Sequence, residues 1–380
     1  MKKIIVYYPF PLKDGSSGSG VRPIKLLEAF SEFARRSNLE CIEIFGTSKE
    51  RKEKLKRLYQ MVNPKDILFC YMENQTIPIW LSDPSHIPMR PLLDYQFMRY
   101  LKKNHIPLGI FYRDIYWKFT DMYKVKNKLV TKIMISLFHY EFKMFEHFAK
   151  KIFLPSIEMN KYLKLSQDKV DISPPGGVDK VNMLKLNHDQ NVTAIYVGGI
   201  HPRYGIYEVL EALSNLNESK TLIELILVCR KNELQENLYL MTPFLKRPWL
   251  KIHHEHGEKL DALYGKADFG IVTLQKNVYN DFAVPVKLFE YMSYGLPVVS
   301  SNCTALQSIV KKDKIGYVTE DNVTSIEQGL MEIMNDKMRE LYRENVIHVL
   351  HSKHLWLKRV ESIYHSLVEP ADDYNRNKEK

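Results

Sequence analysis

The strongest constraint on the fold is an alternation of short apolar runs with longer segments of helical period. In the first half of the chain, strand-length apolar runs alternate with stretches such as residues 24–36, which have the period of an amphipathic helix. The apolar runs lie at 4–8, 41–45, 67–72, 108–112 and 151–155. Continuous apolar strands separated by helices are typical of a parallel sheet covered on both faces. We therefore expect an α/β domain here.

The same alternation restarts after a polar segment. Its apolar runs lie at 193–199, 222–229, 249–255, 268–274, 297–301 and 316–320. A length of 380 residues also favours two domains, at about 150 residues each. We expect two Rossmann-like, doubly wound domains that face a central cleft. The expected divisions are a first domain at 1–178, a linker at 179–191, a second domain at 192–352, a C-terminal helix at 353–369 that can pack back on the first domain, and a flexible tail at 370–380.

The composition narrows the classes of protein that fit. There are 55 Lys and Arg against 45 Asp and Glu, and the net charge of +10 suits an anionic partner. No apolar stretch reaches 18 residues and the N-terminal run is too short for a signal peptide, so we expect a cytoplasmic protein. The four cysteines lie far apart, which argues against a disulfide framework or a zinc knuckle. No recognisable module for nucleic acid accompanies the basic charge.

The most informative segment is VPVKLFEYMSYGLPVVSS at 284–301, which reads as a helix that ends at Gly295, followed by a strand. Lys287 lies in the first helical turn and Glu290 three residues later, so both can share one face. A cation beside a helix N-terminus suits a pyrophosphate, and a carboxylate one turn on can accept from ribose hydroxyls. The alternative is an ordinary Lys–Glu pair on a solvated face.

The pattern K-L-F-E-Y-M-x-x-G-L-P-V-V resembles the donor-binding helix of GT-B glycosyltransferases, particularly family 4, and Lys287 resembles the diphosphate-binding lysine of the membrane-associated glucuronosyltransferase of xanthan synthesis. The resemblance implies a GT-B fold, a nucleotide-sugar donor that is UDP-linked, no cofactor and no metal. It assigns Glu290 to the donor ribose. Retaining members usually place another glutamate eight positions upstream, where this chain has Phe282 beside Asp281, so retention and inversion both stay open.

Three further residues of the second half are donor-binding candidates. Arg203 follows a Gly-Gly turn after the run at 193–199, in a segment that resembles the opening of the C-terminal GT-B domain. Arg230 follows the run at 222–229, beside the expected diphosphate. His256 lies in IHHEHGE, which would line the nucleobase. The alternatives are solvent-exposed arginines and, less favoured, a histidine metal site.

The first half supplies a second glycine segment, PFPLKDGSSGSGVRP at 9–23, with a helix expected near Pro23. It resembles the GT-B loop that approaches the donor phosphate and the acceptor, although it matches no phosphate-binding motif cleanly. The resemblance places Gly20 near the donor and Arg22 on an anionic acceptor group. The alternative is a plain mobile loop.

The pair Arg113–Asp114 follows the run at 108–112 and resembles the His–Asp pair that many family-4 enzymes place beside the donor sugar. An inverting transfer needs a carboxylate to take the proton of the acceptor hydroxyl, and Asp114 is the favoured catalytic base. Arg113 is assigned to the acceptor. Glu73 and Asp94 are rival bases, and the alternative for the pair is an ion pair that only fixes the loop.

The stretch 118–151 holds eight lysines against three acidic residues, with apolar residues interleaved at helical spacing. Such a face can lie on an anionic membrane leaflet, and the alternative is a core helix with solvated lysines. The expected function is transfer of a sugar to a lipid-linked or surface glycan, at the inner face of the cell membrane. The alternatives are a catalytically silent GT-B subunit that stabilises a partner, and a GT-B nucleotide-sugar epimerase.

Overall fold

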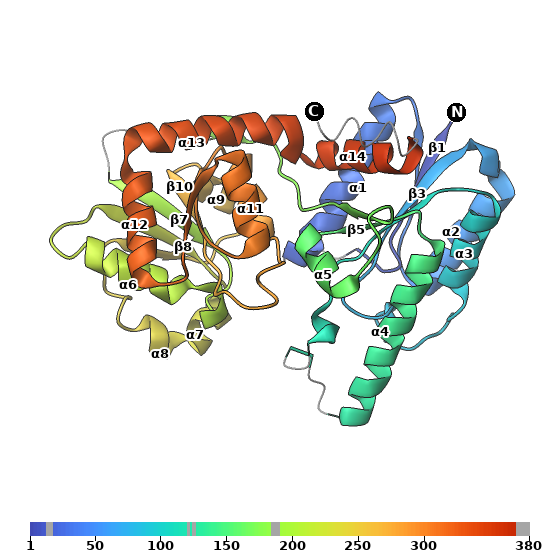
Figure 1. The fold of residues 1–380 in the computed structure, drawn as a ribbon, viewed down its shortest axis with the longest axis horizontal. Coiled ribbons are helices and arrows are strands. Elements are labelled where there is room, and N and C mark those ends of the chain that lie inside the picture. The colour runs from blue at the N-terminus through green and yellow to red at the C-terminus, as the bar shows by residue number, and fades with distance from the viewer. Residues whose placement is uncertain (13–17, 120–121, 124–126, 184–190, 370–380) are drawn as a thin grey trace. The chain divides into compact units, whose positions relative to one another are not determined.

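The computed structural model describes residues 1–12, 18–119, 122–123, 127–183 and 191–369. The chain divides into two compact units (Figure 1). Unit 1 is Met1–Pro174 together with Trp356–Lys380, and unit 2 is Pro175–Leu355. The chain therefore leaves unit 1 after Pro174 and returns to it at Trp356.

Unit 1 is built on a parallel sheet of six strands in the order β2-β1-β3-β4-β5-β6. The strands are β1 (Lys3–Tyr7), β2 (Glu40–Ile44), β3 (Ile67–Glu73), β4 (Leu108–Phe111), β5 (Lys151–Leu154) and β6 (Val170–Ile172). The first five coincide with the apolar runs of the sequence, whereas β6 escapes the pattern because it has only three residues. The strand order reverses between β1 and β3, which makes this pair a topological switch point.

The helices of unit 1 cover the sheet. They are α1 (Gly18–Arg36), α2 (Ser48–Met61), α3 (Leu93–Lys103), α4 (Lys128–Phe148), α5 (Asn160–Leu163) and, from the end of the chain, α14 (Trp356–Val368). Helices α1 and α14 pack together over the sheet, where Phe30 and Val360 are fully buried with Phe69 of β3. The final helix of the chain is thus part of the core of unit 1.

Helix α1 begins at Gly18 and not near Pro23, so the expected loop at 9–23 is shorter than predicted. A proline near the start of a helix removes only one backbone donor close to an end that already lacks partners, and the helix runs through it. Gly20 and Arg22 are therefore helical residues. Residues 13–17 of the expected loop lie outside the described part of the chain.

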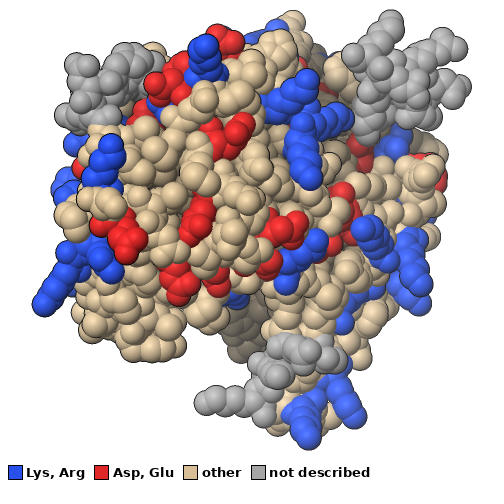
Figure 2. All heavy atoms as spheres, turned by 60° about the vertical axis from the view of Figure 1, so that its left-hand side comes forward, with Lys and Arg blue, Asp and Glu red and all other residues tan. Residues whose placement is uncertain are grey.

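Helix α4 begins with an exposed apolar and basic segment. Leu129, Val130 and Ile133 are 65%, 41% and 52% exposed, whereas Phe138 and Phe145 further along are buried. In Figure 2 the lower projection, where α4 begins, shows Lys or Arg side chains and no acidic side chain among its described residues. Residues 120–121 and 124–126 of the basic stretch lie outside the described part.

Unit 2 repeats the plan with a parallel sheet in the order β12-β11-β10-β7-β8-β9. The strands are β7 (Val192–Val197), β8 (Ile223–Val228), β9 (Leu250–His253), β10 (Phe269–Val272), β11 (Val298–Ser301) and β12 (Gly316–Thr319). All six coincide with predicted runs, so the doubly wound α/β fold class is confirmed. The strand order reverses between β7 and β10, and this pair is the switch point of unit 2.

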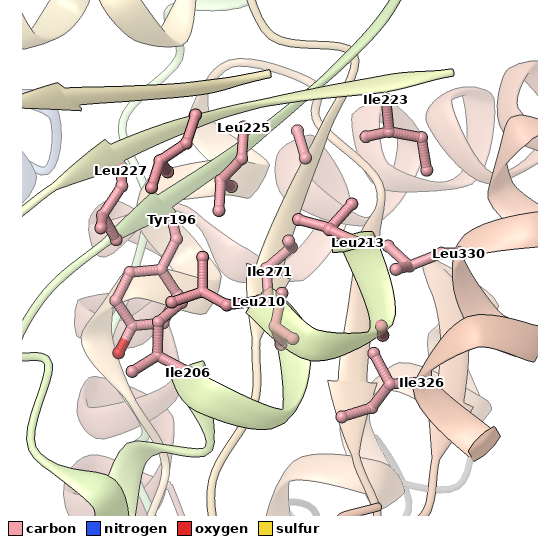
Figure 3. Close-up of a cluster of buried hydrophobic side chains, with 14 of the residues drawn as sticks. Tyr196, Ile206, Leu210, Leu213, Ile223, Leu225, Leu227, Ile271, Ile326 and Leu330 are labelled. Carbon is pink, nitrogen blue, oxygen red and sulfur yellow. The ribbon is translucent and has the colours of Figure 1, made fainter. Parts of the chain in front are cut away.

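Helices lie on both faces of the second sheet. They are α6 (Ile206–Leu216), α7 (Lys231–Glu236), α8 (Leu238–Met241), α9 (Glu258–Tyr264), α10 (Val286–Ser293), α11 (Thr304–Asp313), α12 (Val323–Met334) and α13 (Asp336–Val349). On one face α6 and α12 bury Leu210, Leu213 and Leu330 against Leu225 and Ile271 of the strands (Figure 3). The opposite face is covered mainly by α9, α10, α11 and α13.

The two passages of the chain lie close together in unit 2. Gly177 pairs with Leu355 and donates its N–H to the His354 carbonyl (2.7 Å). Further on, Lys180 donates its N–H to the Ser293 carbonyl (2.8 Å), so the described start of the expected linker 179–191 is bonded to α10. Residues 184–190 and the expected tail 370–380 lie outside the described part. No described helix is long and apolar enough to cross a membrane.

Candidate active site

The turn after β7 lies at the switch point of unit 2. Gly198 has a φ of +145°, which disfavours any residue with a side chain. A Cβ atom on Gly199 would lie 2.6 Å from the ring of Tyr204, so this position also requires glycine. Gly198 donates its N–H to the Val228 carbonyl (3.0 Å), which holds the turn beside the end of β8. Ligands of open α/β sheets bind at this edge, so the turn is a candidate binding site.

Helix α10 is fixed to the same switch point by the hydroxyl of Tyr291. This hydroxyl accepts the Val197 N–H (2.9 Å) and donates to the Ile271 carbonyl (3.3 Å), where β7 and β10 diverge. The ring fits because β10 carries Gly270, at which a Cβ atom would lie 2.3 Å from it. The anchor determines where the two predicted site residues of α10 lie.

Lys287 points at the glycine turn. Its Nζ lies 3.9 Å from the centre of the Tyr196 ring and 3.8 Å from where a Cβ atom on Gly198 would stand. Burial lowers the pKa of Lys287 to about 7, because the ammonium loses hydration and the charge of Glu290 offsets only part of that loss. An incoming anion would supply the missing counter-charge.

Glu290 lies one turn further along α10, as the spacing predicts. Its Oε2 accepts from the Tyr264 hydroxyl (3.4 Å). Burial raises the pKa of Glu290, while Tyr264, Lys287 and Lys180 act in the opposite direction. The result is a cation and a hydrogen-bond acceptor side by side, which suits a charged group attached to a hydroxylated one.

Arg203 contacts Tyr204, whose ring lies against the glycine turn. It belongs to the 3-10 turn Pro202–Tyr204, is exposed, and donates from Nη2 to the Tyr204 hydroxyl (2.7 Å). The Tyr204 ring lies against Gly199 and the Lys287 ammonium lies beside Gly198, so Arg203 is linked to the turn through Tyr204.

Arg230 and His256 lie after the two neighbouring strands. Arg230 is exposed at the start of α7, two residues after the Val228 carbonyl that holds Gly198. His256 is exposed beyond β9, whereas His254 in the same segment is bound through Nδ1 to the Cys229 carbonyl (2.8 Å). No group of three His, Cys, Asp or Glu side chains within the described ranges could hold a metal ion.

The predicted base, Asp114, follows β4 in unit 1 and is half-buried. Its Oδ1 accepts the Tyr116 N–H (3.0 Å). Arg113 donates its backbone N–H to Asn74 Oδ1 (2.8 Å) and its Nη2 to Glu73 Oε2 (3.1 Å). The Arg113–Asp114 turn is therefore held against the end of β3.

The two rival bases are internal. Glu73 is fully buried and bonded to Arg22 (2.9 Å) as well as to Arg113. Asp94 is buried against Arg51 (3.2 Å) and the Tyr7 hydroxyl, and burial raises its pKa. Both carboxylates are enclosed ion-pair partners, which is at odds with a role as acceptor base.

The prediction for Arg22 also disagrees with the structure. Arg22 is 4% exposed and all of its five N–H groups are bonded inside unit 1, so none remains for an acceptor. The sequence suggested a loop arginine because Pro23 was taken as the helix start. Gly20 is only partly exposed within the first turn of α1.

Comparison with known proteins finds a family similar to unit 2 and solved structures that share the fold of the chain. Residues 180–348 match the family Glycosyl transferases group 1. All of the matched residues lie within unit 2. Its glycine turn, Lys287 and Glu290 all lie within the matched residues. A comparison with curated proteins found no match.

Solved structures match the whole chain at low identity. A glycosyltransferase from Rickettsia africae ESF-5 is 16% identical, with a TM-score of 0.62 over 97% of this chain and 100% of that one. Alr3699/HepE from Anabaena, in complex with UDP and glucose, is 12% identical, with a TM-score of 0.62 over 97% and 99%. WaaG, a glycosyltransferase involved in lipopolysaccharide biosynthesis, is 14% identical, with a TM-score of 0.56 over 97% and 100%. The chain has the GT-B fold.

In unit 2, Asp281 caps the start of α11. Asp281 Oδ1 accepts the N–H (2.8 Å) and the hydroxyl (2.7 Å) of Thr304, which begins α11. Phe282 is buried. The carboxylate next to Phe282 is thus engaged at a helix start, where an acidic side chain favours the helix dipole.

Two tyrosines of the candidate site and one buried acidic residue of unit 1 escaped the sequence argument. Tyr264 and Tyr291 of unit 2 orient Glu290 and α10, and isolated tyrosines give no signal in a sequence. In unit 1, Glu141 of α4 is fully buried, and its Oε1 accepts the Ile79 N–H (2.9 Å) while its Oε2 has no partner among the described residues. Burial raises the pKa of Glu141 to about 8. An acidic residue on a basic helix gave no reason to expect this.

Proposed function

We propose that the chain is a glycosyltransferase that moves a sugar from a UDP-linked donor to a lipid-linked or surface glycan. The observation that carries the proposal is the juxtaposition of Lys287, Glu290 and the Gly198–Gly199 turn at the switch point of a group 1 domain. Alr3699/HepE, which shares the fold, has been solved with UDP and glucose, and this supports the choice of nucleotide.

In this proposal the cations neutralise the donor. Lys287 beside the turn and Arg203 on Tyr204 would bind the diphosphate, with Arg230 as a further donor of charge-assisted hydrogen bonds. Glu290 would accept from the ribose hydroxyls, and the segment of His256 would lie along the nucleobase. As the bond between sugar and phosphate breaks, negative charge grows on the departing diphosphate, and fixed cations stabilise it without a metal ion.

The acceptor side is assigned to unit 1. Asp114 is the proposed base for an inverting transfer, because it is the carboxylate after β4 that is only half-buried. In a retaining transfer the departing phosphate would take the acceptor proton, and Asp114 would position the sugar. Arg113 is tied to Glu73 and would orient this turn.

The direct test is turnover of a panel of nucleotide-sugars with a lipid-linked acceptor extract, with the anomeric product read by NMR. For an inverting enzyme, Asp114→Asn should leave donor affinity near normal and reduce transfer by about 100-fold or more. Asp168→Asn, an exposed acid of the same unit, is the control. Donor binding without any transfer would favour the silent subunit, and UDP release without acceptor would favour the epimerase.

A lipid-linked acceptor requires access to a membrane, and the start of α4 is the proposed contact. It presents Leu129, Val130 and Ile133 beside Lys128 and Lys132. Each lysine near an anionic leaflet contributes about 1 kcal/mol, so Lys128→Glu with Lys132→Glu should weaken binding to phosphatidylserine vesicles by about 10-fold or more. Lys52→Glu with Lys56→Glu on α2 makes the same charge change elsewhere in unit 1. Equal losses of vesicle binding in both variants would show that the effect comes from net charge and not from the start of α4.

A further inference from the structure

Arg22 of α1 is the centre of a buried polar network in unit 1. Its Nε donates to Glu73 Oε1 (2.9 Å), and its Nη2 donates to the hydroxyls of Tyr71 (3.3 Å) and Ser173 (3.0 Å). Its Nη1 donates to the carbonyls of Ser173 (3.0 Å) and Pro174 (3.2 Å). A guanidinium offers five N–H groups, and all five are satisfied.

The partners of Arg22 include both places where the chain passes between the units. Ser173 and Pro174 are the last residues of unit 1 before the first passage, and Trp356 is the first residue after the return. The guanidinium carbon lies 3.6 Å from the centre of the Phe111 ring and 5.8 Å from that of Trp356. One side chain therefore fastens both passages to unit 1.

The same network reaches the turn that carries Asp114. Oε1 of Glu73 accepts hydrogen bonds from Nε of Arg22 and from the Tyr71 hydroxyl (2.9 Å). Its Oε2 accepts from Nη2 of Arg113 (3.1 Å). Because Glu73 is fully buried, its charge is balanced only by such partners, and each of them affects how strongly it holds the others.

We propose that Arg22 and Glu73 are positioning residues that couple the chain passages to the Arg113–Asp114 turn. A displacement at Ser173–Pro174 pulls on Arg22, and Glu73 transmits the change to Arg113. The consequence for transfer rests on the proposed function, because it requires Asp114 to face the acceptor. The coupling itself depends only on the network.

A second buried pair of unit 1 provides the matched control. Arg51 is as buried as Arg22 and donates to Asp94 (3.2 Å), to the Tyr7 hydroxyl (3.2 Å) and to the Gly46 carbonyl (2.7 Å). These bonds join α2, α3 and β1 and include neither chain passage nor the Asp114 turn. Comparing the two arginines separates coupling from a general loss of stability.

The first test is hydrogen exchange of the backbone amides from Arg113 to Lys118 in the full chain. Arg22→Lys should raise their exchange rate about 10-fold, and Arg51→Lys should leave it unchanged. Tyr71→Phe removes one hydroxyl that contacts both Arg22 and Glu73, and serves if Arg22→Lys does not fold, with a smaller rise expected. An equal rise in the Arg22 and Arg51 variants, or no rise in the Arg22 and Tyr71 variants, would overturn the coupling.

The second test is a double-mutant cycle on transfer, with Arg22→Lys and Arg113→Lys singly and together. If Glu73 couples the two arginines, their effects on kcat should depart from additivity by about 3-fold or more, with the donor KM unchanged. Arg51→Lys with Arg113→Lys should be additive. Additive effects in both cycles would contradict the coupling. Absence of transfer in the unmodified chain would count against the proposed function, while the exchange result would still decide the coupling.

Discussion

The switch points of the two parallel sheets differ in strand order and in chemistry. In unit 2 the turn after β7 consists of two glycines. The Lys287 ammonium lies beside it, with the Tyr196 ring and, one helical turn away, the Glu290 carboxylate as its neighbours. In unit 1, Glu73 at the end of β3 is ion-paired with Arg22, and both have further partners inside the unit. The Lys287 ammonium of unit 2 is available to a ligand, whereas the Arg22 guanidinium of unit 1 is bonded to groups of its own unit.

The contrast shows that topology places an edge but charge pairing decides what it can bind. A buried arginine with five bonds is stable as it stands, whereas a desolvated lysine with a pKa near 7 gains a favourable interaction only when an anion arrives. This contrast supports the proposal that the nucleotide binds unit 2 and that Arg22 and Glu73 of unit 1 have a positioning role. The following predictions set the two edges against each other.

The largest effect is expected in unit 1, where Glu73 pairs with Arg22. Glu73→Ala would leave Arg22 and Arg113 facing each other's charge without their shared carboxylate, and breaking a buried pair from one side costs about 3–5 kcal/mol of unfolding free energy. Urea unfolding of the full chain measures it. Glu28→Ala, in an exposed pair with Lys25, should cost less than about 1 kcal/mol. Equal costs would show that the Glu73 network does not close this edge.

A pH dependence is expected from Glu141 of α4, which is also buried in unit 1. Its native pKa of about 8 exceeds the ordinary value near 4.3, so the native state holds a proton that the unfolded chain has lost. The stabilisation is complete below the unfolded pKa and is lost as pH rises through about 8. Between pH 6 and pH 8 the native chain should lose about 2–3 kcal/mol relative to Glu141→Gln, which cannot ionise.

Urea unfolding at a series of pH values measures this difference. Glu146→Gln, at an exposed position on the same helix, should run parallel to the unmodified chain. If the unfolding free energies of Glu141→Gln and of the unmodified chain changed with pH in parallel, the Glu141 carboxyl would be ionised in the native state.

The smallest effect is expected in unit 2, from the Tyr291 hydroxyl that fixes α10 to the switch point. Tyr291→Phe removes the hydroxyl that joins Val197 to Ile271, and loss of such a buried bond costs about 1–2 kcal/mol. UDP affinity should fall only a few-fold, because α10 keeps its packing. Tyr239→Phe, a highly exposed tyrosine of unit 2, should change neither quantity. If Tyr291→Phe left both UDP affinity and unfolding free energy unchanged, the Tyr291 hydroxyl would not fix α10.

Much of the fold could be predicted because parallel strands buried on both faces leave an unmistakable apolar run. The runs marked eleven of the twelve strands, and the three-residue β6 was too short to leave one. The helix at 286–293 was recognisable because its sequence pattern joins a proline start, a lysine, a glutamate and a glycine end. Spacing alone placed Lys287 and Glu290 together.

Burial of charged groups could not be predicted in the same way. Nothing in the local sequence of Arg22 distinguishes it from Arg203, yet one is enclosed and the other exposed, because the partners of Arg22 lie up to 152 residues away. The same holds for Glu73, Asp94 and Glu141. Long-range pairing decides which charged residues remain available to a ligand, and it becomes visible only in three dimensions.

The most direct measurement of the central claim is calorimetric titration of UDP into the full chain at pH 6.5 to 8.5. Lys287→Ala should weaken binding by about 10- to 100-fold, as for loss of a charge-assisted contact, while Lys266→Ala, an exposed lysine of unit 2, should not. Affinity of the unmodified chain should fall as pH rises above about 7 and the ammonium is lost, and the Lys287 variant should lack this dependence. Equal UDP affinity in both variants at every pH would contradict the account.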